Sequence, residues 1–370
     1  MKILVRFLIA IVLSLMVLGA MLVFTASSTY SEVRFDNIYF LFNAHIGKMM
    51  FAILVGIAFS IIPYQYYNKY SKQAILVVVV MLLLTVLFAP KFKGAARWIN
   101  LGLFRFQPSE LAKLVLFMHL AGMIERKGKL IQDFKNGFLY PLIWIFSIAG
   151  LVVLQPNMST AMIIVFTSFP LLYIGGSKFK HIASILGGAT LTGFGLMMLF
   201  SHSRQRILGF VESINGNSEP NIQVLQAKIG LGSGGMFGVG VGASRQSDLF
   251  LPESYGDFIF SILGEQFGLI GTVLVLSLYF ALFVIGIIIA KKSESQYGQL
   301  LAFAISFNII MSAFINAAVV TGLVPTTGIT LPFISFGGTS IILFSISVGI
   351  LINIANQGNK KKSLRISAID

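Results

Sequence analysis

Residues 258–290 read FIFSILGEQFGLIGTVLVLSLYFALFVIGIIIA, an apolar run with one charged residue, Glu265. As a helix this run would be about 50 Å long, which exceeds the roughly 30 Å hydrocarbon core of a bilayer. The whole 370-residue chain has the same character, because 56% of its residues are hydrophobic and 11% are charged. Soluble proteins carry about 25% charged residues. The composition therefore excludes a soluble globular domain and predicts a protein embedded in a membrane.

Further stretches long enough to span a bilayer recur along the chain. About ten are expected, near residues 7–27, 45–63, 73–89, 108–124, 137–154, 157–174, 181–201, 262–290, 299–321 and 338–356. The sequence therefore predicts an all-α, polytopic membrane protein with a single membrane domain over residues 1–370. Most of the 27 lysines and arginines lie in connections on the side of the N-terminus. The positive-inside rule then places both termini in the cytoplasm, including a basic tail at 357–370.

Nine of the remaining basic residues fall in the predicted outer connections, where positive charge is normally scarce, and Lys48 and Lys113 lie at or within spans. Eight of the nine gather in two places: Lys91, Lys93, Arg97 and Arg105 in one short connection, and Arg204, Arg206, Lys228 and Arg245 in the one long loop at 202–257. As a group they indicate an outer surface that meets an anion, such as a lipid phosphate or pyrophosphate. The net charge of +14 is thus mainly a topology signal, and we expect no nucleic-acid partner.

The long loop at 202–257 is predicted to lie outside the cytoplasm. Residues 206–214 place Ile207, Val211 and Ile214 on one helical face, which favours an amphipathic helix on the membrane surface. The following run, GLGSGGMFGVGVG at 230–242, has two interpretations. It forms a tight loop dominated by its backbone, or its glycines permit close approach of a sugar or phosphate.

Asp257 directly precedes the apolar run 258–290 and should lie at the outer interface. At helical spacing Asp257, Ser261 and Glu265 would share one face. A carboxylate at the mouth of a cavity with a second acid deeper in the helix suits a general base. Alternatively, Asp257 is the N-cap of the helix. The spacing alone leaves both interpretations open.

Three more segments have a polarity that is unusual for their predicted location. Glu110 and Lys113 lie in the first turn of a predicted span, where they either neutralise each other or line a polar cavity. Asn157 is polar too, and a cap or packing contact is its expected role. The connection at 324–340 has two prolines and no charge, which is typical of a re-entrant segment buried in protein or lining a cavity.

These segments resemble, in order, the motifs of the SEDS family (shape, elongation, division and sporulation). The motifs are Gly94–Ile99, Gln107–Lys113, Gln155–Asn157, Gly232–Gly238, Leu251–Phe260 and Pro325–Gly338. The resemblance implies a peptidoglycan glycosyltransferase that polymerises lipid II at the outer face of the bacterial cytoplasmic membrane. The amino-acid sequence at residues 238–246 and 325–328 is more similar to the division branch of the family than to the elongation branch. Two positions depart from the family pattern, which has an acid at Asn157 and a tyrosine at Phe336.

The resemblance also implies roles for individual residues. Asp257 matches the essential aspartate of the family, which favours catalysis over capping. The substrate-binding residues implied are Glu110, Lys113, Arg97, Trp98, Glu253, Ser335 and Gly337. A class B penicillin-binding transpeptidase and other divisome or elongasome membrane proteins are the implied partners.

Polymerisation of lipid II would invert the anomeric carbon, because the α-linked sugar becomes β-linked. Asp257 would remove the proton of the acceptor hydroxyl while undecaprenyl pyrophosphate leaves. Arg97, Arg204, Arg206 and Lys113 are candidates to offset the pyrophosphate charge, with or without a divalent ion such as Mg or Mn. The four histidines show no ligand spacing and cysteine is absent, so no protein metal site is expected. A lipid-precursor flippase and a scaffold for other cell-wall enzymes are the alternatives.

Overall fold

The computed structural model describes residues 1–89, 97–100, 105–199, 201–214 and 221–366. Its long helices are α1 (Lys2–Phe35), α2 (Phe40–Ile61), α3 (Tyr64–Phe88), α4 (Pro108–Lys127), α5 (Leu139–Val153), α6 (Met158–Ile174), α7 (Phe179–Leu199), α8 (Ser201–Ile214), α9 (Ile222–Gly234), α10 (Ile259–Lys292), α11 (Gln296–Val320) and α12 (Gly338–Ile366). Short helical turns are η1 (Gly128–Gln132), η2 (Phe134–Phe138) and η3 (Gln246–Phe250). Two residues each of β1 (Ile99–Asn100) and β2 (Arg105–Phe106) form an antiparallel pair. The all-α prediction is confirmed.

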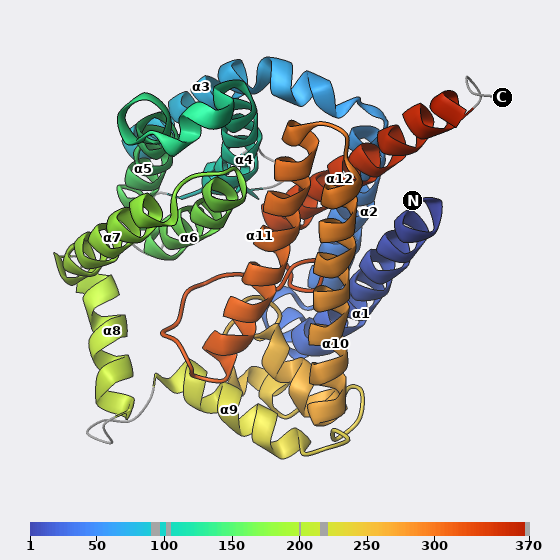
Figure 1. The fold of residues 1–370 in the computed structure, drawn as a ribbon. Coiled ribbons are helices and arrows are strands. Elements are labelled where there is room, and N and C mark those ends of the chain that lie inside the picture. Colours follow the sequence, from blue (N-terminus) through green and yellow to red (C-terminus); the bar gives the residue numbers. More distant parts are fainter. Residues whose placement is uncertain (90–96, 101–104, 200, 215–220, 367–370) are drawn as a thin grey trace.

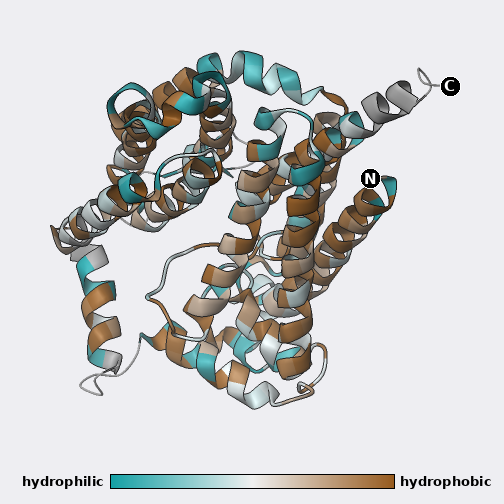
Figure 2. Cartoon of the chain, in the orientation of Figure 1, coloured by the Kyte–Doolittle hydropathy of each residue, from teal (hydrophilic) through white to brown (hydrophobic). Residues whose placement is uncertain are grey.

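Each of the ten predicted spans coincides with a helix, namely α1 to α7 and α10 to α12. Among the described residues, seven helices are long and apolar enough to cross a membrane, and α6 is a shorter apolar helix of 17 residues. Hydrophobic residues cover α1, α2 and α10 along much of their length (Figure 2). A polytopic membrane protein is therefore confirmed, whereas the number of ten crossings stays a prediction.

The helices form one bundle with a clear polarity. The beginning of α1 and the end of α12 lie at the same end of the bundle, and α8 and α9 lie at the opposite end (Figure 1). This arrangement agrees with an even number of crossings. Which of these ends faces the cytoplasm remains a prediction.

The apolar run 258–290 is not one uninterrupted helix. Gly268 has φ 67° and ψ −166°, so α10 is broken at that residue. A Cβ at Gly268 would lie 2.5 Å from the amide nitrogen of Gly238 and the carbonyl oxygen of Met236. The break therefore accommodates the glycine-rich loop, which packs its backbone directly against α10.

The segment between α11 and α12 is irregular, and part of it is buried. Residues 331–335 are all buried, as predicted for a segment enclosed by protein, whereas residues 321–330 are half-buried or exposed. The α1 helix passes close to it, since a Cβ at Gly19 would lie 2.7 Å from the Cα of Ile334. Buried irregular backbone must satisfy its polar groups inside the protein.

The long loop at 202–257 is itself largely structured. The predicted amphipathic helix is present as α8, and α9 and η3 follow it. Gly230 and Gly232 belong to α9, so only the part from Gly235 onward is a loop. Gly235, Gly238, Gly240 and Gly242 all have positive φ. The glycine-rich run thus serves a tight, backbone-dominated turn, as the first of its two interpretations predicted.

Candidate functional site

Asp257 lies in the connection between η3 and α10, half-buried, and α11 fixes its backbone. Its carbonyl oxygen accepts a hydrogen bond of 2.7 Å from Nδ2 of Asn316, which also donates to the Ile329 carbonyl at 2.7 Å. One carboxylate oxygen of Asp257 lies 3.4 Å from the position that a Cβ would take at Gly328, where φ is 75°. The carboxylate therefore packs against a glycine turn that an L side chain would strain.

Ser335 and its neighbour hold the residues just before Asp257. The Ser335 hydroxyl donates to the Gly256 carbonyl at 2.9 Å and accepts from the Leu331 amide at 2.8 Å. The Phe336 amide donates to the Tyr255 carbonyl at 2.9 Å. The described contacts of Ser335 thus position the aspartate loop. Gly337 follows at a half-buried position, where a Cβ would overlap the Ser340 hydroxyl.

Two arginines from distant parts of the sequence lie near Asp257. Arg97 donates from Nε to the Gln155 carbonyl at 3.4 Å and from Nη2 to the Pro156 carbonyl. Arg206, on α8, donates to the Thr326 carbonyl at 3.0 Å. Backbone carbonyls therefore orient both guanidinium groups.

The charges of this group act on one another. Burial lowers the pKa of Arg97, and so does the positive charge of Arg206, whereas the Asp257 carboxylate raises it. Burial also lowers the pKa of Arg206, and Asp257 again opposes that effect. One carboxylate flanked by two guanidinium groups can accept a proton while the arginines stabilise an anionic leaving group.

Three other predicted site residues differ in their exposure to solvent. Arg204 is exposed on α8 and makes no hydrogen bond or ion pair within the described part of the chain. Trp98 is half-buried immediately before β1. Glu253 is exposed with φ 60°, and its carbonyl accepts from the Gly256 amide at 2.9 Å. Lys91 and Lys93 lie outside the described residues.

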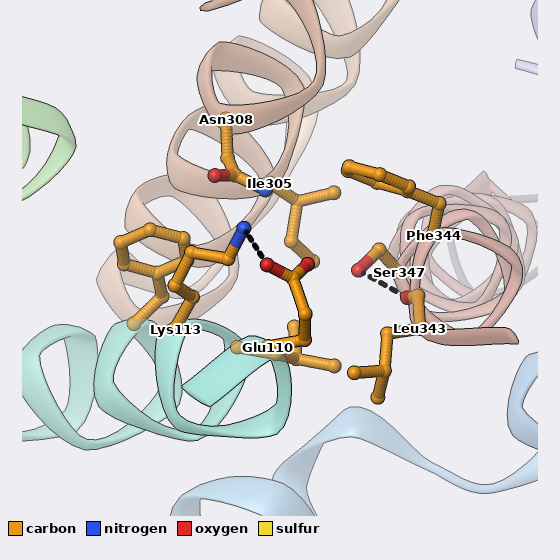
Figure 3. Close-up of a pocket in the computed structure, with 9 residues that line it drawn as sticks. Glu110, Lys113, Ile305, Asn308, Leu343, Phe344 and Ser347 are labelled. Atoms are coloured by element: carbon orange, nitrogen blue, oxygen red, sulfur yellow. Dashed lines mark hydrogen bonds and ion pairs between the residues drawn. The ribbon is translucent and has the colours of Figure 1, made fainter. Parts of the chain in front are cut away.

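Glu110 and Lys113 form an ion pair of 2.9 Å in the first turn of α4. Both line a cavity, where they face Asn308 of α11 and Phe344 and Ser347 of α12 (Figure 3). The cavity has a volume of about 10 Å³, room for roughly one water molecule. The pair therefore neutralises itself, as the first interpretation predicts, and it lines a small cavity in which apolar side chains outnumber polar ones.

One polar contact links the start of α4, which carries this pair, to the connection whose carbonyls accept hydrogen bonds from Arg97. Asn157 begins α6 without a capping hydrogen bond from its side chain, and its Nδ2 donates to the Ser109 hydroxyl at 3.4 Å. Ser109 precedes Glu110, and the residue before Asn157, Pro156, accepts from Arg97. Asn157 is buried, so it makes the packing contact that was expected of it.

The predicted alignment of Asp257 with Ser261 and Glu265 is wrong, because α10 begins only at Ile259. The capping position is Phe258, and no side chain caps the helix, so the N-cap interpretation of Asp257 fails as well. Glu265 is buried and accepts hydrogen bonds from the Ser233 and Ser244 hydroxyls and from the Arg245 and Gln246 amides. It anchors the glycine-rich loop and is not a second acid beside Asp257.

Asn316 contacts Asp257 but was not among the site residues predicted from the sequence. It is 1% exposed, and its amide joins the backbone of Asp257 to Ile329 in the segment before α12. Its signal in the sequence is weak, because it is one of three amides in the apolar stretch 299–321, with Gln299 and Asn308.

The described residues do not fit a metal site built by the protein. Among them, no three His, Asp or Glu side chains gather at one place. Asp257 would offer a divalent ion a single carboxylate, so any such ion would depend on oxygens of the substrate.

Comparisons with known proteins agree with the geometry. The family model described as "Cell cycle protein", which covers FtsW, RodA and SpoVE, matches residues 5–360. Stage V sporulation protein E of Bacillus subtilis (strain 168) is 35% identical over 94% of this chain and 96% of that protein. A probable peptidoglycan glycosyltransferase FtsW of Geobacter sp. (strain M18) is 35% identical over 92% of this chain and 93% of that protein.

Solved structures share the fold. A chain from a structure on the coordination of polymerization and crosslinking by a peptidoglycan synthase complex has a TM-score of 0.77 at 22% identity. It covers 95% of this chain and 97% of that one. The rod shape determining protein RodA of Thermus thermophilus has a TM-score of 0.71 at 22% identity, covering 95% and 96%. The match to the family model and the identity to relatives over nearly the full length show that this chain belongs to the SEDS family of FtsW, RodA and SpoVE proteins.

Proposed function

We propose that this protein is a peptidoglycan glycosyltransferase of the FtsW type, which polymerises lipid II and releases undecaprenyl pyrophosphate. The observation that carries the proposal is the placement of Arg97 and Arg206 beside Asp257. Relatives at 35% and 32% identity are named probable peptidoglycan glycosyltransferase FtsW, which supports the same activity. These names, together with a carboxylate that has two arginines near it, favour a polymerase over a lipid-precursor flippase.

In the proposed reaction, the hydroxyl oxygen of the acceptor sugar attacks the anomeric carbon of the donor sugar. The bond between that carbon and the pyrophosphate oxygen breaks, and the configuration at the carbon inverts. The acceptor proton passes to the Asp257 carboxylate, which acts as general base. The lipid pyrophosphate leaves with both electrons of the broken bond, and Arg97 and Arg206 stabilise its negative charge.

The other predicted residues would extend this site. Glu110 and Lys113 are proposed to contact the substrate at the start of α4, beside the Ser109–Asn157 contact. The other proposed substrate contacts, around Asp257, are Arg204, Trp98, Glu253 and Gly337. Ser335 would contribute by holding the loop that carries Asp257 in position. A divalent ion such as Mg or Mn would bind to the substrate pyrophosphate.

The cellular setting is part of the proposal. A multi-pass membrane protein of the bacterial FtsW type would present Asp257 on the extracytoplasmic side, where α8 and α9 lie. A structural relative comes from a peptidoglycan synthase complex concerned with both polymerization and crosslinking. This supports a class B penicillin-binding transpeptidase as the partner, together with other membrane proteins of cell division or, less directly, elongation.

The test compares wild type and Asp257→Asn, each purified as the full chain with its transpeptidase partner. Labelled lipid II is supplied and the glycan polymer is measured. Loss of the base should lower the rate by at least about a hundredfold. Asp36→Asn is the matched control, because Asp36 is exposed and has φ 52°, a conformation that asparagine tolerates. Equal polymerisation by Asp257→Asn would remove the base assignment, and lipid translocation without polymer in vesicles would identify a flippase.

A further inference from the structure

Lys48 is a basic residue inside a membrane-spanning helix that the mechanism above does not use. It lies in α2, half-buried, and its Nζ is 4.1 Å from the centre of the Phe336 ring. Among the described residues, no carboxylate forms an ion pair with it. A cation within a span is costly unless it has a function or a partner. The Phe336 ring orients the ammonium group but leaves its hydrogen-bond donors unused.

The surroundings of Lys48 connect it to the catalytic loop. His45, one turn earlier on α2, is fully buried, and neither ring nitrogen has a hydrogen-bond partner among the described residues. Its ring lies 5.8 Å from the Phe336 ring. Phe336 in turn packs edge-on against Tyr255 at 5.7 Å, two residues before Asp257. Thus α2 presents two nitrogen-bearing side chains to the segment that holds the proposed base.

An apolar groove begins beside Lys48. It has a volume of about 350 Å³ and is lined by side chains that include Phe51, Met81, Phe106, Leu111, Ile342 and Ile346. Phe51 is one helical turn after Lys48. The Lys48 Cδ and Cε lie 3.9 Å from the position of a Cβ at Gly338, and the next residue, Thr339, also lines the groove. A cation at the edge of an apolar groove between helices is complementary to a lipid with an anionic headgroup.

The proposed reaction needs two such lipids at once. The donor pyrophosphate leaves from the carbon under attack, so it must lie beside Asp257, where Arg97 and Arg206 can offset its charge. The acceptor carries its own pyrophosphate at the opposite end of its disaccharide from the reacting hydroxyl. One cluster of cations cannot hold both groups, because their charges repel and their positions along the substrates differ.

We propose that Lys48 and the groove beside it form the acceptor site. The Lys48 ammonium binds the pyrophosphate of the incoming lipid II, and the groove takes the first part of its polyprenyl chain. This inference rests on the proposed function, because it names the second substrate of the same active site.

The test measures lipid binding without turnover. The Asp257→Asn protein, in nanodiscs of zwitterionic lipid, is titrated with lipid II, and bound lipids per chain are counted by native mass spectrometry. We expect two lipid II molecules per chain. With Lys48→Met added, the weaker of the two affinities should fall by about tenfold or more, the effect of one charge-assisted hydrogen bond. Lys48→Arg should restore binding at least in part.

Lys69→Met is the matched control, since Lys69 also lies over an aromatic ring, that of Tyr70, at 5.5 Å, but on α3 away from the groove. It should bind two lipids like the parent. A groove-filling change, Met81→Trp, should weaken the same step as Lys48→Met. The proposal is wrong if the Asp257→Asn protein binds only one lipid II, or if Lys48→Met binds two with unchanged affinities. Failure of the proposed function would instead appear as a wild-type protein that makes no polymer.

Discussion

Asn316, on α11, holds the backbone of the loop that carries Asp257, the proposed general base. Its amide donates to the carbonyls of both Asp257 and Ile329, and it is buried. Asn316→Ala should leave two carbonyls without these donors, at a stability cost of about 1–3 kcal/mol. Because the Asp257 backbone would lose its restraint, we expect kcat for polymerisation to fall about tenfold or more, with a smaller change in KM. Steady-state kinetics with labelled lipid II measure both values.

Ser312→Ala is the control for this change. Ser312 is also buried in α11, but its hydroxyl donates only to the carbonyl one turn earlier, Asn308, at 2.8 Å. It should keep kcat near that of wild type. If Asn316→Ala kept the wild-type kcat too, the positioning role of Asn316 would be refuted.

Seven of the ten site residues predicted from sequence are charged, in a chain where only 11% of the residues are charged. This is why Asp257, Arg97 and Arg206 could be singled out before their contacts were known. Asn316 and the Ser335 contact to Gly256 could not be predicted, because their partners are far away in the sequence. The alignment of Glu265 with Asp257 was wrong for the same reason. Its partners in the glycine-rich loop lie about 20 or more residues earlier, and helical spacing does not reveal them.

At the scale of elements, Glu265 ties the glycine-rich loop to α10. Its carboxylate accepts hydrogen bonds from the Arg245 amide at 3.1 Å and the Gln246 amide at 3.3 Å. Glu265→Gln removes the charge and turns an NH2 group toward donors, which should cost about 2 kcal/mol or more. We expect a lower melting temperature and faster hydrogen exchange over residues 235–250. Glu212→Gln, at an exposed position of α8, should change neither.

Two glycines of the same region give opposite predictions. Gly238 has φ 84°, and a Cβ there would overlap the Gln266 carbonyl, so Gly238→Ala should destabilise the protein by more than about 1 kcal/mol. Gly232 is exposed in α9 with no atom within 4 Å of a Cβ, so Gly232→Ala should stabilise by up to about 1 kcal/mol. Thermal unfolding in detergent compares them. Equal effects of the two changes would contradict the packing of this loop on α10.

At the scale of the whole molecule, hydropathy predicted the positions of the membrane helices well, because an apolar run of sufficient length has few alternatives in a bilayer. Each of the ten predicted spans has a helix, and α8 was expected within the long loop. Within residues 221–258, the helix α9 and the turn η3 were not predicted. The glycines and short apolar stretches of this segment have no clear period, and its fold depends on contacts with α1 and α10.

The orientation of the molecule gives a final prediction. The chain has no cysteine, so a single introduced cysteine reports on one place only. Phe237 is 81% exposed in the glycine-rich loop, and Lys129 is exposed in η1, a connection predicted to be cytoplasmic. In spheroplasts, a membrane-impermeant maleimide should label Phe237→Cys and not Lys129→Cys, and both should react after the membrane is permeabilised. Because the glycine-rich loop is hydrogen-bonded to residues 265–270 of α10, the helix that follows Asp257, labelling of Phe237→Cys from outside would place the proposed base on the side where lipid II is consumed. The reverse pattern would place it in the cytoplasm and exclude polymerisation at the outer face.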